Sequence, residues 1–169
     1  MGLIDRTISL TLPVVPRPVV RYFSRPYIAG TTMAEALTVV RRLADLGAMS
    51  TLDILGEFVS RKEEAGANTE AYIDLIKRIK ADGLSQAHVS VKLTALGLLI
   101  DPRRCLEHMR RLVAQAEACG NFVRIDMEDS SCTDRTLEIY RGLREEFGNE
   151  RIGVVLQSRL HRTIADTQA

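Results

Sequence analysis

The sequence is poor in the residues that build small cross-linked or metal-bound folds. It has no tryptophan, only 5% aromatic residues, and three cysteines, which are Cys105, Cys119 and Cys132. Three is an odd number and no CxxC spacing occurs, which argues against a disulfide framework or a zinc knuckle and fits a reducing compartment. The three histidines show no metal-ligand spacing. The sequence therefore predicts no metal site.

Long apolar runs and a strong charge imbalance are also absent from the sequence. No run approaches the roughly 18 apolar residues of a membrane span, and the N-terminus lacks the layout of a signal peptide. The 23 basic and 22 acidic residues leave a net charge of +1, which argues against a generally basic nucleic-acid binder. We therefore expect a cytoplasmic protein that does not bind nucleic acid.

The remaining composition is that of a globular protein with two N-terminal segments. The 169 residues are 46% hydrophobic and 27% charged, which is enough for a real core. Residues 1–30 hold four of the five prolines, so we predict a proline-rich arm with at most short helical pieces. A helix is predicted over 31–47, because Thr32 and Glu35 form a capping box at its start and Gly47 suits its end.

From residue 48 onward, strand patterns and helix patterns alternate. Short apolar runs predict four strands, at 48–55, 88–93, 122–127 and 152–157. Helical spacing predicts helices at 68–81, 101–120 and 133–147, and the start of another at 160–169. This alternation indicates parallel strands joined by crossover helices, as in a doubly wound open sheet or a (β/α)8 barrel. The sequence has neither GxGxxG nor a GxxxxGKS or GxxxxGKT phosphate loop, which favours the barrel.

Charged and amide side chains recur at the ends of the predicted strands. They are Asp53 and Glu57 after the first run, then Lys92, Asp126 and Gln157. The carboxyl ends of barrel strands converge on the active-site mouth, where a cation, a carboxylate and an amide would bind a small polar substrate or a cofactor ring. The alternative is structural. Lys92 and Asp126 would then form an ion pair that closes the end of the barrel, and the two earlier carboxylates would cap loops.

Four strings in these strands resemble a known family. They look like the first four strands of proline dehydrogenase, of the monofunctional bacterial type, and are TLDILGE at 51–57, VSVKLT at 89–94, RIDME at 124–128 and VVLQS at 154–158. The run YIAG at 27–30 also resembles that family. The resemblance covers roughly residues 20–169, with the strings in order and at plausible spacing. Together the strings are specific, whereas any one of them alone would be weak.

The resemblance implies a flavoenzyme whose distorted (β/α)8 barrel holds FAD. Such an enzyme oxidises L-proline to Δ1-pyrroline-5-carboxylate and passes the electrons to a membrane quinone, which implies peripheral contact with the inner membrane. Lys92 matches the lysine that pairs with the substrate carboxylate, and Asp126 matches a catalytic acidic residue close to the substrate. Met127 and Gln157 match positions that contact the flavin. An ammonium complements a carboxylate, and an amide can both donate to and accept from a flavin ring.

The chain departs from the family in its length. A (β/α)8 barrel takes about 250 residues, or roughly 31 for each unit, so residues 48–169 correspond to about four units. The family's later strands and last helix, which carry further flavin and substrate contacts, have no counterpart here. We therefore expect the first half of a barrel, with open sheet edges that favour self-association, and we expect this chain not to oxidise proline by itself.

Two other functions stay open from the sequence. The chain would be a non-catalytic half-barrel or assembly module if it pairs with itself or with a second half. An unrelated barrel enzyme could instead use Lys92 to form a Schiff base with a carbonyl substrate, which borohydride trapping would detect.

Overall fold

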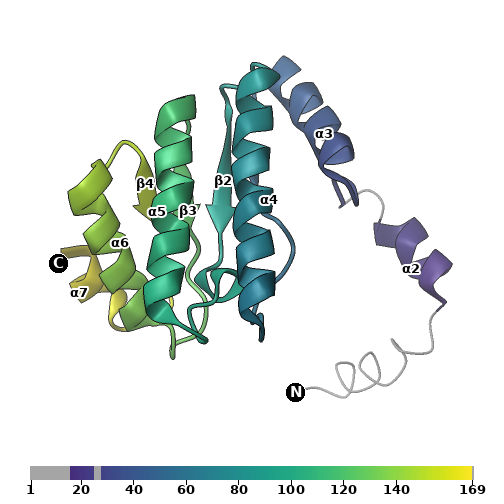
Figure 1. Ribbon diagram of the computed structural model, residues 1–169. Coiled ribbons are helices and arrows are strands. Elements are labelled where there is room, and N and C mark those ends of the chain that lie inside the picture. The colour runs from purple at the N-terminus through teal and green to yellow at the C-terminus, as the bar shows by residue number, and fades with distance from the viewer. Residues whose placement is uncertain (1–15, 25–27, 169) are drawn as a thin grey trace. The chain divides into compact units, whose positions relative to one another are not determined.

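The computed structural model describes residues 16–24 and 28–168 (Figure 1). Most of the predicted proline-rich arm, and Tyr27 of the YIAG run, lie outside the described residues. The chain divides into two compact units, Met1–Val39 and Val40–Ala169, and each is described by itself. The domain boundaries predicted at 30/31 and 47/48 stay predictions.

The N-terminal segment contains one short helix and the start of a longer one. Helix α2 (Arg17–Ser24) is a short helical piece of the kind expected in the arm. Helix α3 (Met33–Asp45) begins with the predicted capping box: Glu35 N donates to Thr32 Oγ1 (3.3 Å), and Thr32 N donates to the Glu35 carboxylate (3.2 Å). Gly47 follows α3 with φ +78°, a left-handed conformation that glycine adopts without strain. The predicted helix is confirmed and is shorter by two residues at each end.

The second unit is built on a four-stranded parallel sheet. The strands pair in chain order and are β1 (Ser50–Leu52), β2 (Ala87–Val91), β3 (Val123–Ile125) and β4 (Ile152–Val154). Each strand lies beside the strand of the preceding unit, as neighbouring strands do in the wall of a (β/α)8 barrel.

The strands are connected by α4 (Lys62–Ala81), by the short 3₁₀ helix η3 (Leu93–Leu96) with α5 (Pro102–Cys119), and by α6 (Thr133–Phe147). Helix α7 (Thr163–Gln168) follows the last strand. Helices α4, α5 and α6 lie side by side in front of the strands (Figure 1). The arrangement confirms the predicted fold class, an α/β chain with four βα units in barrel order.

The core lies between the sheet and this helix layer. Alternate strand residues point toward the helices and are fully buried, and they are Val89, Val91, Val123, Ile125 and Ile152. They meet buried helix residues, which include Ile76, Met109, Leu112 and Leu143. The opposite face of the sheet carries polar and charged side chains, many of them half-buried. The sheet is therefore apolar toward its helices and polar on its other face, which a barrel would turn inward.

Other predicted boundaries also differ from the structure. Helix α4 begins at Lys62, six residues before the predicted start at Asn68. The prediction starts too late because residues 62–67 have little apolar periodicity. Glu63 and Glu64 nevertheless suit a first helical turn. The strands are shorter than the apolar runs that predicted them. The run at 88–93, for example, leaves the sheet after Val91, and its next residue, Lys92, is the extended residue that caps the 3₁₀ helix.

The start of α5 provides a test of local stability. Asp101 accepts a hydrogen bond from Arg104 N (3.3 Å), and Pro102 takes the first helical position, as the sequence predicts. Asp101→Ala is expected to lower the free energy of unfolding by about 1 kcal/mol, measured by urea denaturation. Asp101→Ser keeps the cap but loses the ion pair to Lys62 (3.8 Å), and it is expected to cost less than half as much. Equal losses in the two variants would assign the effect to the ion pair.

Candidate functional site

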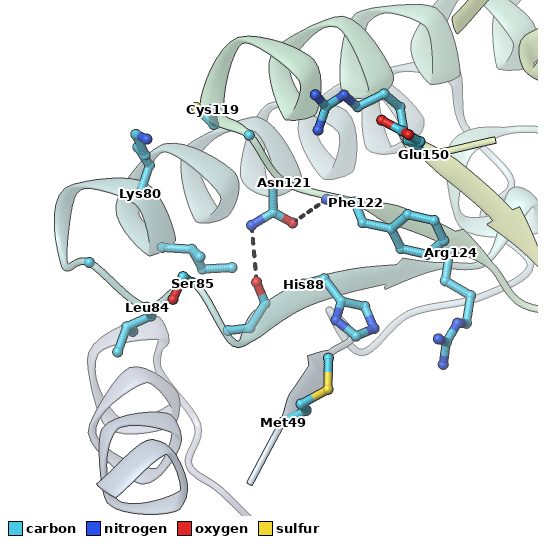
Figure 2. Close-up of a pocket in the computed structure, with 15 residues that line it drawn as sticks. Met49, Lys80, Leu84, Ser85, His88, Cys119, Asn121, Phe122, Arg124 and Glu150 are labelled. Atoms are coloured by element: carbon cyan, nitrogen blue, oxygen red, sulfur yellow. Dashed lines mark hydrogen bonds between the residues drawn. The ribbon is translucent and has the colours of Figure 1, made fainter. Parts of the chain in front are cut away.

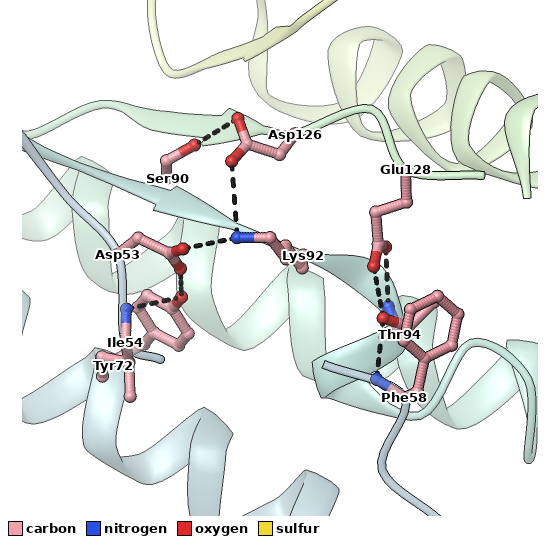
Figure 3. A network of polar contacts seen from close by, with 9 residues as sticks. All are labelled: Asp53, Ile54, Phe58, Tyr72, Ser90, Lys92, Thr94, Asp126 and Glu128. Atoms are coloured by element: carbon pink, nitrogen blue, oxygen red, sulfur yellow. Dashed lines mark hydrogen bonds and ion pairs between the residues drawn. The ribbon is translucent and has the colours of Figure 1, made fainter. Parts of the chain in front are cut away.

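Three charged side chains meet at the carboxyl edge of the sheet. Asp53 directly follows β1, Lys92 directly follows β2, and Asp126 directly follows β3. Lys92 Nζ lies 2.5 Å from Asp53 Oδ2 and 3.9 Å from Asp126 Oδ2 (Figure 3). The three side chains are between one quarter and one third exposed, so they remain open to a ligand. The structure thus brings together the groups that the sequence placed at the strand ends.

The electrostatics of this cluster favour a charged lysine. The hydrogen bond to Asp53 raises the pKa of Lys92 above its ordinary value, although partial burial opposes it, and the charge of Asp126 adds to the rise. Lys92 is therefore an ammonium at neutral pH. The cluster has two carboxylate groups and one ammonium group, so its formal net charge is −1. Lys92 therefore neutralises only part of the negative charge around it. Glu57 lies in the exposed loop after β1, and its charge makes a further, smaller contribution to the rise in the Lys92 pKa.

Each of the two carboxylates is also held by a hydroxyl group. Tyr72 OH, on α4, donates to Asp53 Oδ1 (2.7 Å) and accepts from Ile54 N (3.0 Å). Ser90 Oγ, on β2, donates to Asp126 Oδ1 (2.8 Å). Burial is the largest cause that raises the pKa of the Tyr72 phenol, followed by its hydrogen bond to Asp53. The phenol therefore stays protonated and keeps donating.

A second cluster holds the loop between β1 and α4. The Glu128 carboxylate accepts from Thr94 N (3.0 Å) and from the Thr94 hydroxyl, and Phe58 N donates to that same hydroxyl (3.1 Å) (Figure 3). Phe58 has φ +54°, the left-handed region that a non-glycine residue adopts only when its surroundings hold it there. Thr94 lies in η3, beyond the end of β2.

The predicted flavin contacts lie at the same edge. Gln157 follows β4, and its Nε2 lies 3.4 Å from Met127 O and 3.5 Å from Glu128 O. The hydroxyl of Thr163 donates to Gln157 O (2.5 Å), which fixes the backbone at this point. Met127 is buried, with 9% of its surface exposed. Gln157 and Met127 are therefore adjacent, and the roles assigned to them, to Lys92 and to Asp126 stay predictions.

The opposite edge of the sheet holds a cavity of about 500 Å³ (Figure 2). His88 lies in it with Nε2 3.0 Å from Thr51 Oγ1 and its ring edge-on to Phe122, at 5.7 Å between centroids. Burial, and then the charge of Arg124, lower the pKa of His88. Within the described ranges, no three histidine, cysteine, aspartate or glutamate side chains are grouped so that they could hold a metal ion.

His88 predicts a dependence of stability on pH. Its pKa is lowered in the folded chain, so as the pH falls through about 6.5 the unfolded chain takes up the proton first. The free energy of unfolding is therefore expected to be highest above pH 6.5 and to fall toward pH 5. In His88→Gln, the free energy of unfolding should depend less on pH between pH 6.5 and pH 5. The measurement is urea denaturation at several pH values in this range. His161→Gln, at an exposed position, is the control, and a slope that is unchanged in His88→Gln would contradict the prediction.

A comparison with known families identifies the chain's relatives. A family model described as proline dehydrogenase matches residues 36–169. The chain belongs to the proline dehydrogenase family. A proline dehydrogenase of Deinococcus radiodurans is 35% identical over 166 residues, with 92% of this chain and 53% of that protein covered. Proline dehydrogenase 1 of Bacillus subtilis is 36% identical over 146 residues, covering 86% and 47%. The chain thus spans about half the length of these curated proline dehydrogenases.

Solved structures agree with the fold. The proline utilization A protein (PutA) from Bdellovibrio bacteriovorus, inactivated by N-propargylglycine, matches with a TM-score of 0.75 and 25% identity, over 83% of this chain and 18% of that chain. A PutA mutant from Bradyrhizobium japonicum matches with a TM-score of 0.61 and 19% identity, over 72% and 14%, which shows the fold alone. None of the described helices is both long enough and apolar enough to cross a membrane.

Sequence reasoning found the charged groups of the site and missed the hydroxyls that hold them. In the helix predicted over 68–81, the spacing of Tyr72, Ile73, Ile76 and Ile79 indicates an apolar face and so only a packing role for Tyr72. It is the one residue of that set with a polar atom, and a buried phenol usually finds a hydrogen-bond partner. The phenol oxygen was therefore the feature from which a polar role of Tyr72 could have been predicted. For Ser90 the sequence gives a weaker indication, which is that it shares a strand face with Lys92.

Proposed function

We propose that this chain takes part in the oxidation of L-proline to Δ1-pyrroline-5-carboxylate, with FAD as the cofactor and a quinone as the final electron acceptor. The observation that carries the proposal is the Lys92 ammonium held at 2.5 Å by Asp53, beside Asp126, at the carboxyl edge of the sheet in a proline dehydrogenase family member. The curated relatives that the chain matches are named proline dehydrogenases, which supports proline as the substrate.

The charges of the cluster suit a zwitterionic amino acid. An ammonium has three N–H donors, and Asp53 uses one of them, so Lys92 has donors left for a substrate carboxylate. We assign the contact with the substrate nitrogen to Asp126 Oδ2, since it is the nearby carboxylate atom at the longer distance from Lys92. The nitrogen releases its extra proton to water, to which the one-third-exposed Asp126 is open, and a hydride equivalent then leaves the carbon bonded to that nitrogen. A carboxylate at that nitrogen orients the amine and stabilises the cation that forms.

The residues of this edge also fit a flavin. Lys92 supplies a fixed positive charge, Gln157 supplies an amide, and the buried Met127 supplies an apolar contact beside them. When it is bound, FAD supplies the acceptor for the hydride equivalent. The role of this chain is to present the ammonium, the amide and the apolar side chain on one edge, so that substrate and cofactor are bound next to each other. The anchored carboxylates keep that edge in one geometry.

The test is reconstitution. The chain is purified alone, and also co-expressed with the part of the Deinococcus radiodurans proline dehydrogenase that lies beyond its match. Flavin content is read from the absorption spectrum, and activity from proline-dependent reduction of a dye. We expect flavin and turnover in the complex and no turnover by the chain alone. Turnover by the chain alone would contradict the expected inactivity. A complex without flavin and without turnover would contradict the proposed function.

The electron acceptor and the place of the reaction belong to the same proposal. We assign electron transfer to a quinone at the membrane surface, with the chain itself in the cytoplasm. The reconstituted complex is expected to reduce a water-soluble ubiquinone analogue when proline is present, and to sediment with vesicles that contain the quinone. Reduction of the dye without reduction of the quinone would contradict this assignment.

A second candidate function is that of a non-catalytic half-barrel that self-associates. Among the described residues, β1 and β4 each pair with one strand only, and unpaired strand edges favour association with another chain. Light scattering on the purified chain tests this function. A stable dimer without flavin would favour it, and a monomer would exclude it.

A further inference from the structure

We propose that the hydroxyl groups of Tyr72 and Ser90 are positioning groups for Lys92, and that they act through the two carboxylates beside it. Each carboxylate has one oxygen held by a hydroxyl of the scaffold and the other oxygen facing Lys92 (Figure 3). The inference rests on the proposed role of Lys92 in binding the substrate carboxylate.

The two anchors have the same pattern of contacts although they come from different elements, and they differ in the distance to Lys92. On one side, Tyr72 OH lies 2.7 Å from Asp53 Oδ1 while Asp53 Oδ2 lies 2.5 Å from Lys92 Nζ. On the other side, Ser90 Oγ lies 2.8 Å from Asp126 Oδ1 while Asp126 Oδ2 lies 3.9 Å from Lys92 Nζ. The carboxylates can therefore not rotate freely about their terminal bonds. The position of the ammonium is set by a helix, α4, and by a strand, β2.

Packing alone does not require the Tyr72 hydroxyl. Tyr72 is 1% exposed, and a phenylalanine ring would fill the same space. What the hydroxyl adds is an acceptor for Ile54 N and a donor to Asp53, both at the point where the chain leaves β1. Asp53 is one-third exposed, so without that donor its carboxylate is free to turn toward water.

Neutral donors suit this purpose better than charged ones would. A second cation beside Asp53 would compete with Lys92 for the carboxylate and would change the net charge of the cluster. A hydroxyl orients one oxygen and leaves the charge of the carboxylate for the ammonium. The Lys92 ammonium is therefore fixed in place before substrate binds. This lowers the entropy cost of ordering the Lys92 side chain when substrate binds.

The first experiment measures Lys92 itself in the full chain, without substrate. The pKa of Lys92 is read by NMR titration of its side-chain carbon in wild type, Tyr72→Phe, Asp53→Asn and the double variant. We expect Tyr72→Phe to weaken proton binding by Lys92 about three- to tenfold, because Asp53 holds the ammonium less firmly. The double variant should differ little from Asp53→Asn, since Tyr72 acts through Asp53. An unchanged Lys92 in Tyr72→Phe, or additive effects, would overturn the proposal.

One control variant and one alternative variant accompany this experiment. Tyr140→Phe removes a hydroxyl from α6, where the ring faces Arg144, and is expected to leave the Lys92 titration unchanged. Where Tyr72→Phe does not fold, Ser90→Ala tests the anchor on the other carboxylate and is expected to produce a smaller weakening, since Asp126 lies farther from Lys92. No change in Ser90→Ala would then overturn the proposal.

The reconstituted complex separates this inference from the proposed function. We expect Tyr72→Phe to raise the KM for proline about three- to tenfold and to change kcat less, because a positioning defect weakens the binding of the carboxylate. Coupling of Tyr72 to Lys92 in a complex that does not act on proline would refute the function and keep the anchor. Proline oxidation with no such coupling would refute the anchor and keep the function.

Discussion

Lys92→Met is expected to raise the KM for proline at least about 30-fold in the reconstituted complex. Removal of one partner of a charge pair in a binding site costs about 2–5 kcal/mol, and 2 kcal/mol corresponds to about a 30-fold change in affinity. The loss should therefore be no smaller than the low end of that range. Without the ammonium, the anchored carboxylates of Asp53 and Asp126 face an incoming substrate carboxylate and repel it. The measurement is the rate of dye reduction against proline concentration.

A matched variant controls for the loss of any lysine. Lys77 is an exposed residue of α4 that lies 3.8 Å from Asp74, so Lys77→Met also removes an ion pair, but far from the carboxyl edge of the sheet. We expect its KM to stay within about twofold of wild type, since exposed pairs contribute little. Flavin content is measured in both variants. A Lys92→Met complex with normal flavin and an unchanged KM would show that another group binds the substrate carboxylate.

Ile125→Ala is expected to lower the free energy of unfolding by about 2–5 kcal/mol, the cost of a cavity where an isoleucine filled the core. Ile125 is fully buried on β3, and its partners in the sheet are Val91 and Val154. The next residue in the chain is Asp126, whose backbone N–H donates to Val91 O (2.9 Å). The variant should therefore loosen the site as well as the core. Urea denaturation followed by circular dichroism measures the stability.

The same substitution at an exposed position provides the comparison. Ile164 lies on α7 and is 74% exposed, so Ile164→Ala is expected to change the free energy of unfolding by less than about 0.5 kcal/mol. Similar losses in the two variants would mean that β3 is not part of a common core with the helices. That result would contradict the described packing.

The sequence predicts the order of the elements well because each one buries a single face. Helices α5 and α6 begin and end within one residue of the ranges 101–120 and 133–147 that the apolar spacing predicts. Strand ends are harder to predict, because side-chain alternation continues for several residues after the backbone leaves the sheet. At Lys92 the chain turns into a 3₁₀ helix, which depends on its hydrogen bonds with other segments and not on its own apolar pattern.

In the candidate site, too, some features could be predicted from the sequence and others could not. The positions of Lys92 and Asp126 follow from the rule that parallel strands present their carboxyl ends at one edge. The short distance from Lys92 to Asp53 does not follow from it, because the rule does not say which carboxylate comes closer. The contact of Tyr72 with Asp53 depends on the angle between a helix and a strand end. Periodicity identifies the buried face of the helix but not which group its one polar atom will meet.

The pairing of strands in chain order also bears on how the protein is made. Among the described residues, β2, β3 and β4 each pair with the strand of the unit synthesised just before. The sheet can therefore grow during synthesis, with β2 docking on β1 and each later strand on the one before it. The lysine and both carboxylates are then in place once β3 has docked, before β4 and the segment after it have left the ribosome.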